Sequence, residues 1–237
     1  MDGSSECGGS VLFKTLLGDL DDAFLRTDDA VRGMKFESAV RVANNQLTRK
    51  QKEGVVYFDS ADRTVFPYAF EQVAEAMPKV MVANPATDFE TIEAQDEKDT
   101  ITVKYLVKYQ LTPGESGSFR IYAAAKKFRE NDRLVLLWRS FTEGLGRFEG
   151  WQSDDTTWMV VRPSSVKFDR SYTVLESYTR LVPIELGNTS GCDNINSFVN
   201  IIAKSGEEEF KQMMHTMEKM VINATVTASS QVRGNRS

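Results

Sequence analysis

The most regular part of this sequence is a long segment near its C-terminal end, from Asn194 to about Val226. Apolar residues recur in it at three- and four-residue steps, the spacing of one face of an α-helix, while Glu207–Glu209 take the opposite face. A helix of roughly thirty residues is about 45 Å long. Because such a helix must lie across a whole sheet to bury its apolar side, the segment predicts a single α+β domain. The apolar positions are Ile195, Phe198, Ile202, Phe210, Met213, Met214, Met217, Met220, Val221 and Ala224.

The middle of the chain predicts the sheet. Residues 101–111 alternate between apolar and polar side chains, as a half-buried strand does, and Glu130–Asp132 separates two strand patterns as a tight turn. About seven strands are expected, and the last six follow one another, which favours an antiparallel meander. Ser60–Asp62 is interpreted as a turn that ends a strand, and a helix over Ala69–Met81 is expected to kink or end at Pro78.

The ends of the chain are predicted to lie outside the core. Residues 1–10 are small and polar and are interpreted as a disordered tail, and residues 227–237 as a polar tail. The single domain then covers 11–226 and opens with an amphipathic helix over 11–33, for which Ser10 is a plausible N-cap. The polar stretch 37–53 is interpreted as a connector.

Composition excludes several classes of function. The 237 residues include two Cys and one His, too few for a Cys/His zinc site, and no metal or cofactor is predicted. The net charge of −5 argues against nucleic-acid binding by bulk electrostatics. The acidic pairs, such as Asp154–Asp155, lack the spacing of a calcium loop and are interpreted as solvated acids. Without a secretory signal or a run of about 18 apolar residues, we expect a cytoplasmic chain with no stable membrane insertion; transient membrane contact stays open.

Five runs of the sequence resemble an oomycete family of START-like proteins, often described as mating-specific proteins. The resemblance covers roughly Leu12 to Met220. It implies a helix-grip fold, in which a curved antiparallel sheet wraps around the long C-terminal helix and leaves an internal cavity, and it carries over no catalytic residues. The runs are VFPYAFEQVAEAM, RLVLLWRSFTEG, GWQSDDTTWMVVRP, SYTRLVP and FVNIIAKSGEEEFKQMMHTMEKM.

A cavity under one helix predicts where ligand-binding residues lie. Charged residues share strand faces with apolar ones in two strands, and such charges are either paired or directed into a hydrated cavity. The methionines of the C-terminal helix either line a site for apolar ligands or pack as ordinary core. The candidate ligand-binding residues are Tyr105, Arg139, Glu176, Tyr178, Arg180, Phe198, Ile202, Met213 and Met217.

Three functions follow as hypotheses. The first is non-enzymatic binding of a lipid or another apolar small molecule in the cavity. The second is a cyclase- or hydratase-like enzyme using Arg139, Glu176 or Tyr178 as acid–base groups, and a buried carboxylate with a raised pKa would favour it. The third is an interaction module in which the helix Val11–Leu25 pairs with a partner. Trp151, in a Gly-rich loop, is the best candidate for a cavity mouth, and His215 is interpreted as a helix residue without a catalytic role.

Overall fold

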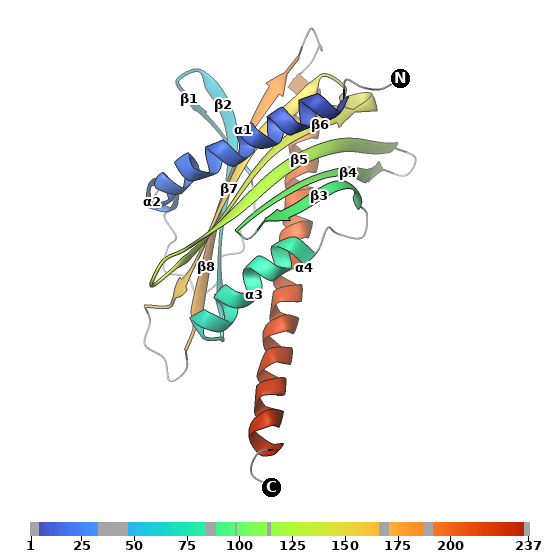
Figure 1. Cartoon of the computed structure of the whole chain (residues 1–237). Helices are drawn as coiled ribbons and strands as arrows, with labels where there is room; N and C mark the ends of the chain where they lie inside the picture. Colours follow the sequence, from blue (N-terminus) through green and yellow to red (C-terminus); the bar gives the residue numbers. More distant parts are fainter. Residues whose placement is uncertain are drawn as a thin grey trace.

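The computed structural model describes residues 5–32, 47–83, 89–97, 99–112, 115–165, 171–186 and 192–234. In that part of the chain the fold is α+β, with one antiparallel sheet and helices on both of its faces (Figure 1). The elements in chain order are α1 (Ser5–Leu25), α2 (Thr27–Arg32), β1 (Thr48–Lys52), β2 (Val55–Phe66), α3 (Phe70–Ala83), β3 (Phe89–Glu97), β4 (Thr100–Thr112), β5 (Glu115–Arg129), β6 (Leu134–Leu145), the 3-10 turn η1 (Gly146–Phe148), β7 (Trp151–Pro163), β8 (Thr173–Glu185) and α4 (Cys192–Gly234).

The sheet has eight strands in the order β1-β2-β8-β7-β6-β5-β4-β3. The six strands β3 to β8 form a continuous meander, which confirms the predicted antiparallel arrangement. The strand that the sequence did not predict is β1, at the end of the supposed connector. All five of its residues are exposed, so it has no alternation of polar and apolar side chains that could reveal it.

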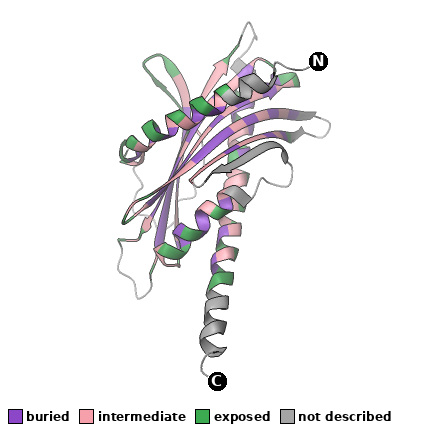
Figure 2. Ribbon diagram, in the orientation of Figure 1, coloured by how far each residue is buried: buried purple, intermediate pink, exposed green. Residues whose placement is uncertain are grey.

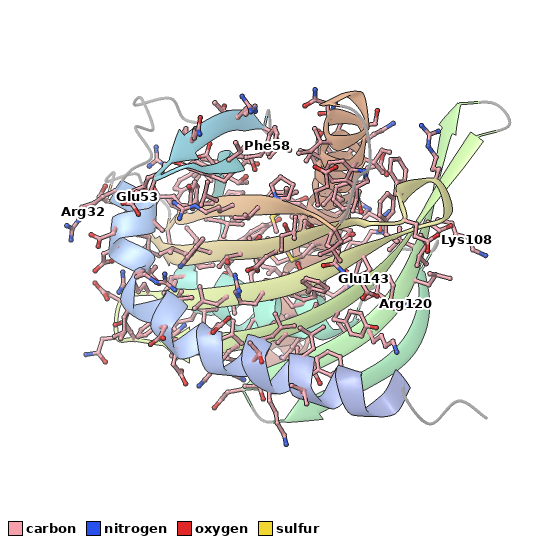
Figure 3. All side chains as sticks on the ribbon, turned by 90° about the horizontal axis from the view of Figure 1, so that it is seen from above. Arg32, Glu53, Phe58, Lys108, Arg120 and Glu143 are labelled. Atoms are coloured by element: carbon pink, nitrogen blue, oxygen red, sulfur yellow. The ribbon has the colours of Figure 1, made fainter. Side chains whose placement is uncertain are left out.

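The two faces of the sheet carry different helices. The inner face, defined here as the one covered by α3 and α4, includes Leu134, Leu136 and Met159. The outer face lies under α1 and includes Val135 and Leu137, because successive side chains of a strand point to opposite sides. Figure 3, seen from above, shows α1 and α4 on opposite sides of the sheet.

The helix α1 is fixed to the outer face by its apolar side. Phe13, Leu16, Leu20 and Ala23 are buried there, and the indole N–H of Trp158 donates a hydrogen bond of 3.0 Å to the Ala23 carbonyl. The apolar stripe that suggested a partner helix is therefore covered within the chain. The helix begins at Ser5 rather than after a Ser10 cap, so the predicted tail is shorter than ten residues.

The helix α4 is held at two places along its length. Near its start, Phe198 and Val199 are buried in an aromatic cluster with Phe119 and Trp151. Further along, Met217 and Val221 pack with residues of α3. The long C-terminal helix is thus confirmed, and it continues to Gly234, past the predicted end and beyond the edge of the sheet (Figure 1).

Several local predictions are corrected by the structure. Ser60–Asp62 lies inside β2 rather than in a turn, and Trp151 begins β7 rather than lying in a Gly-rich loop. The helix α3 does not end at Pro78 but continues to Ala83. The predicted helix over 11–33 is divided at Arg26 into α1 and α2, and residues 33–46 lie outside the described part of the chain.

Burial follows this arrangement. The central strands are buried along most of their length, whereas β1 and one side of α1 are exposed (Figure 2). Within the described residues, no helix is both long and apolar enough to cross a membrane.

Candidate functional site

A cavity of about 250 Å³ lies between the inner face of the sheet and the middle of α4. It occupies the stretch between the two places where α4 is packed, because the helix residues that line it run from Ile202 to Met213. The sheet forms its floor, and α4 with the end of α3 forms its roof.

The floor is polar across several neighbouring strands. Asp155 lies opposite Ser140 in the sheet, and Asp62 lies opposite Ser177. The hydroxyl groups of Thr157 and Thr179 are hydrogen-bonded to each other at 2.9 Å. Hydroxyl and carboxyl groups therefore face the cavity where a core sheet would normally present aliphatic side chains. The polar floor residues are Ser60, Asp62, Ser140, Thr142, Asp155, Thr157, Ser177 and Thr179.

The roof is largely apolar and has a gap in its middle. Ile202, Phe210 and Met213 line the cavity from α4, as Val80 and Met81 do from α3. Between Ile202 and Phe210 the same helix face carries Gly206, and a Cβ added there would meet no atom within 4 Å. Gly206 is itself exposed, so the roof is open to solvent at this turn of the helix.

Asp155 is the most perturbed acid of the cavity. It is 7% exposed, and burial raises the pKa of its carboxyl to about 8, although hydrogen bonds from the Ser153 and Thr142 hydroxyls oppose the increase. Ser153 donates to Oδ2 at 3.1 Å, whereas Oδ1 is buried without a hydrogen-bond partner. Asp155 is therefore a protonated acid at neutral pH, and one of its oxygens is buried at the cavity wall without a hydrogen-bond partner among the described residues.

Glu209 is a second acid of this kind on the roof. Burial raises its pKa to about 7, against the opposing effect of a 2.9 Å hydrogen bond from the Ser205 hydroxyl. Its side chain keeps partial contact with solvent, which screens its charge, so we consider its perturbation the smaller of the two. Near it on α4, Glu207 pairs with Lys211 at 2.5 Å.

Three of the nine predicted ligand residues line the cavity: Tyr105, Ile202 and Met213. Phe198 and Met217 lie on the same helix but are fully buried where α4 is packed, outside the cavity lining. For these two, packing at helical spacing was the correct alternative, because they belong to the clusters that hold the helix at both ends.

Arg139 lies on the outer face of the sheet, away from the cavity. Its guanidinium donates hydrogen bonds to Asp19 of α1 at 3.1 Å and to Asp154 at 3.2 Å, so it ties α1 to the sheet. The neighbouring Glu143 likewise pairs with Arg120 at 3.3 Å on that face, where Figure 3 labels both. The assignment of this strand face to a ligand is therefore corrected, since period-two alternation directs Ser140 and Thr142 inward instead.

Glu176, Tyr178 and Arg180 also point to the outer face. Glu176 accepts two hydrogen bonds from Arg162, at 2.9 and 3.1 Å, and forms a structural ion pair. Tyr178 donates to Asp59 at 3.1 Å, and Arg180 donates to the Tyr178 hydroxyl at 3.2 Å. The residues of this strand that reach the cavity are the alternate ones, Ser177 and Thr179.

The remaining candidates, Trp151 and His215, are not among the residues that line the cavity. Trp151 is 3% exposed within the aromatic cluster around Phe198, so it does not form the mouth of the cavity. His215 is exposed on α4. Within the described residues, no group of three or more His, Cys, Asp and Glu side chains could hold a metal ion.

Sequence reasoning missed the polar floor, and Asp155 in particular. The pair Asp154–Asp155 was interpreted as solvated, but the two side chains point to opposite faces of β7. A detectable signal was present: polar residues recur at every second position in Ser60–Asp62, Ser140–Thr142 and Ser177–Thr179. Alternation that repeats in neighbouring strands indicates one polar patch on one face.

Comparisons with known proteins found distant structural similarities but no matching family. No family model matches the chain, and no curated protein matches it. A protein of unknown function from Staphylococcus aureus is similar over 71% of this chain and 96% of its own, at 13% identity and a TM-score of 0.38. A conserved protein from Geobacillus kaustophilus is similar over 68% and 95%, at 12% identity and a TM-score of 0.37. The Mll3558 protein from Rhizobium loti is similar over 70% and 98%, at 11% identity and a TM-score of 0.34.

Proposed function

We propose that this chain binds a small apolar or amphipathic molecule in the cavity beneath α4, without changing it chemically. The observation that carries the proposal is the unfilled space itself. The clusters around Phe198 and Met217 pack α4 closely on either side of the cavity, yet the floor beneath the stretch between them is left uncovered. Protein interiors are otherwise close-packed, and concave sites of this kind are where small molecules bind.

The cavity sets the size and character of the ligand. About 250 Å³ lies just below the range of roughly 300–1,000 Å³ that is typical of small-molecule sites. The space suits a compact molecule, or one end of a lipid, better than a whole two-chain phospholipid. A hydroxyl- and carboxyl-bearing floor opposite an apolar roof favours a ligand with one polar and one apolar side.

We extend the proposal to kinship with the START-like helix-grip proteins, including the oomycete family that the sequence runs resemble. Support comes from a long C-terminal helix lying against the inner face of an antiparallel meander, and from a cavity between the two. In such a fold the helix and the sheet together enclose the ligand.

Native mass spectrometry of the purified chain, followed by solvent extraction, tests the proposal. We expect a small molecule to come off the wild-type chain and the Gly206→Ala variant, because a methyl group there meets nothing within 4 Å. The matched variant Gly206→Phe fills the space and should lose the ligand. Retention of the same molecule by Gly206→Phe would place the ligand elsewhere, and the absence of any bound molecule, in extracts and in ligand screens, would refute the proposal.

An acid–base enzyme is the second candidate, and one specific observation favours it. The cavity contains a buried carboxyl whose pKa, about 8 at Asp155, is suited to proton transfer near neutral pH, and Tyr105 lines the same space. Arg139, Glu176 and Tyr178 have no part in this version because they lie on the outer face. Mass spectrometry of the extracted molecule before and after incubation with fresh chain tests it: conversion that Asp155→Asn abolishes would establish an enzyme.

A further inference from the structure

The charges around the cavity are all of one sign. Among the described residues that line it, four are acids, Asp62, Asp155, Glu207 and Glu209, and none is Lys, Arg or His. A site for a neutral molecule could be built from the hydroxyl groups of the floor alone. An ionised carboxylate is costly to bury without a cation, so four acids around one cavity favour a positively charged occupant over a neutral one.

Two of these acids have compensation within the protein. Glu207 is paired with Lys211, and Asp62 has an interaction of its own. The other two do not form an ion pair with a described residue. Asp155 is hydrogen-bonded to Ser153 through one oxygen and buries the other without a partner, and the hydrogen bond of Glu209 comes from the neutral Ser205 hydroxyl.

The shape of the site favours an organic cation over a metal ion. No group of three or more metal-ligating side chains was found in the described part of the chain. The lining instead includes aromatic side chains, Tyr105, Trp138 and Phe210, whose ring faces attract ammonium groups, and the aliphatic surface of Ile202 and Met213. A bare metal ion would leave this apolar surface without a partner.

We propose that the ligand is a small amphipathic amine whose ammonium group pairs with the Asp155 carboxylate, while its apolar part lies under α4. The inference rests on the proposed binding function and specifies its ligand. Binding couples to one proton: the neutral Asp155 acid releases its proton to solvent, and the carboxylate that remains pairs with the ammonium ion. The charge of the amine does not change on binding, because alkylammonium groups stay protonated well above neutral pH.

The pH dependence of binding involves every charged group that faces Asp155. On the cavity side these are Asp62 of the floor and Glu207 and Glu209 of α4. Behind it, on the outer face, Arg139 favours the ionised form of Asp155 and Asp154 opposes it. Because burial outweighs both, the affinity for an amine should rise roughly tenfold per pH unit from pH 6 to about 8, as deprotonation of Asp155 becomes easier.

Calorimetry with matched probes tests the inference. Tryptamine is compared with its neutral analogue tryptophol, and 2-phenylethylamine with 2-phenylethanol, in phosphate and in HEPES at pH 7, whose different ionisation enthalpies report proton release. We expect the amines to bind more tightly than the alcohols, with about one proton released for each amine bound. Asp155→Asn should weaken amine binding by roughly ten- to a hundredfold and remove most of the proton release. Glu209→Gln should have a smaller effect, and the exposed Glu208→Gln none.

The outcomes separate this inference from the function on which it rests. If the alcohols bind as well as the amines, or if Asp155→Asn leaves amine affinity and proton release unchanged, the ammonium assignment is wrong while the cavity remains a ligand site. If neither amine binds, the assignment is also wrong, and the extraction experiment decides independently whether the cavity holds another molecule.

Discussion

Replacing Asp155 with Asn should stabilise the protein, and increasingly so as the pH rises. Asn has nearly the same shape as the protonated acid and can keep the hydrogen bond with Ser153, but it has no charge to bury. The raised pKa of Asp155, about 8 against an ordinary 3.8, means that the folded chain holds a proton that the unfolded chain releases. Stability of the wild-type chain is therefore lost as the pH rises from about 4 to about 8.

The magnitude follows from the same pKa. Each tenfold change in an ionisation constant corresponds to ~1.4 kcal/mol, so moving the pKa of Asp155 from 3.8 to about 8 costs the ionised folded state about 6 kcal/mol. The difference in unfolding free energy between Asp155→Asn and wild type should grow by ~1.4 kcal/mol per pH unit from pH 5 to 7. Glu209 titrates in both proteins, so its contribution cancels in this difference.

Urea denaturation followed by tryptophan fluorescence at pH 5, 6 and 7 provides the measurement. Trp151 and Trp158 are buried and should report unfolding of the sheet. The exposed acid in the β5–β6 turn provides the matched control variant, Asp132→Asn, which makes the same chemical change without altering a buried group. A flat difference for Asp155→Asn would refute the reasoning, because it would mean that the cavity solvates the Asp155 carboxylate as water does.

Three further predictions concern two glycines and one ion-paired arginine. Gly206→Ala should raise the unfolding free energy by up to about 1 kcal/mol in urea denaturation, because it improves helix propensity in open space; destabilisation would show that the middle of α4 packs against the sheet after all. Gly144→Ala should lower the melting temperature markedly, with a loss of about 1–3 kcal/mol, because its Cβ would lie 2.2 Å from the Phe148 carbonyl oxygen; an unchanged melting temperature would contradict this contact. Arg139→Ala should cost about 1 kcal/mol, because Asp19 and Asp154 are 44% and 39% exposed and water screens both carboxylates, yet it should leave ligand affinity in calorimetry unchanged; weaker binding would show that the outer face contributes to the site.

The sequence predicted the meander and the long helix because both depend on strong periodic signals. Residues 101–111 alternate apart from Leu106, and the apolar stripe of α4 is sustained over many turns. The strand β1 could not be found in this way, because all its side chains are exposed and its place in the sheet is set by pairing with β2. Pairing between segments is a long-range property that one local pattern does not contain.

The errors at the site have a common physical cause, and it connects them with function. Ser60–Asp62 was interpreted as a turn, and Asp155 as a solvated acid, because inward-facing strand positions are expected to be apolar. Both expectations fail in the same part of the inner face, beneath the helix position of Gly206. Ionising Asp155 in this floor is costly, because burial disfavours the charged form of its carboxyl. Positions where a sequence departs in this way from the rules of core packing are the first places to test for a function.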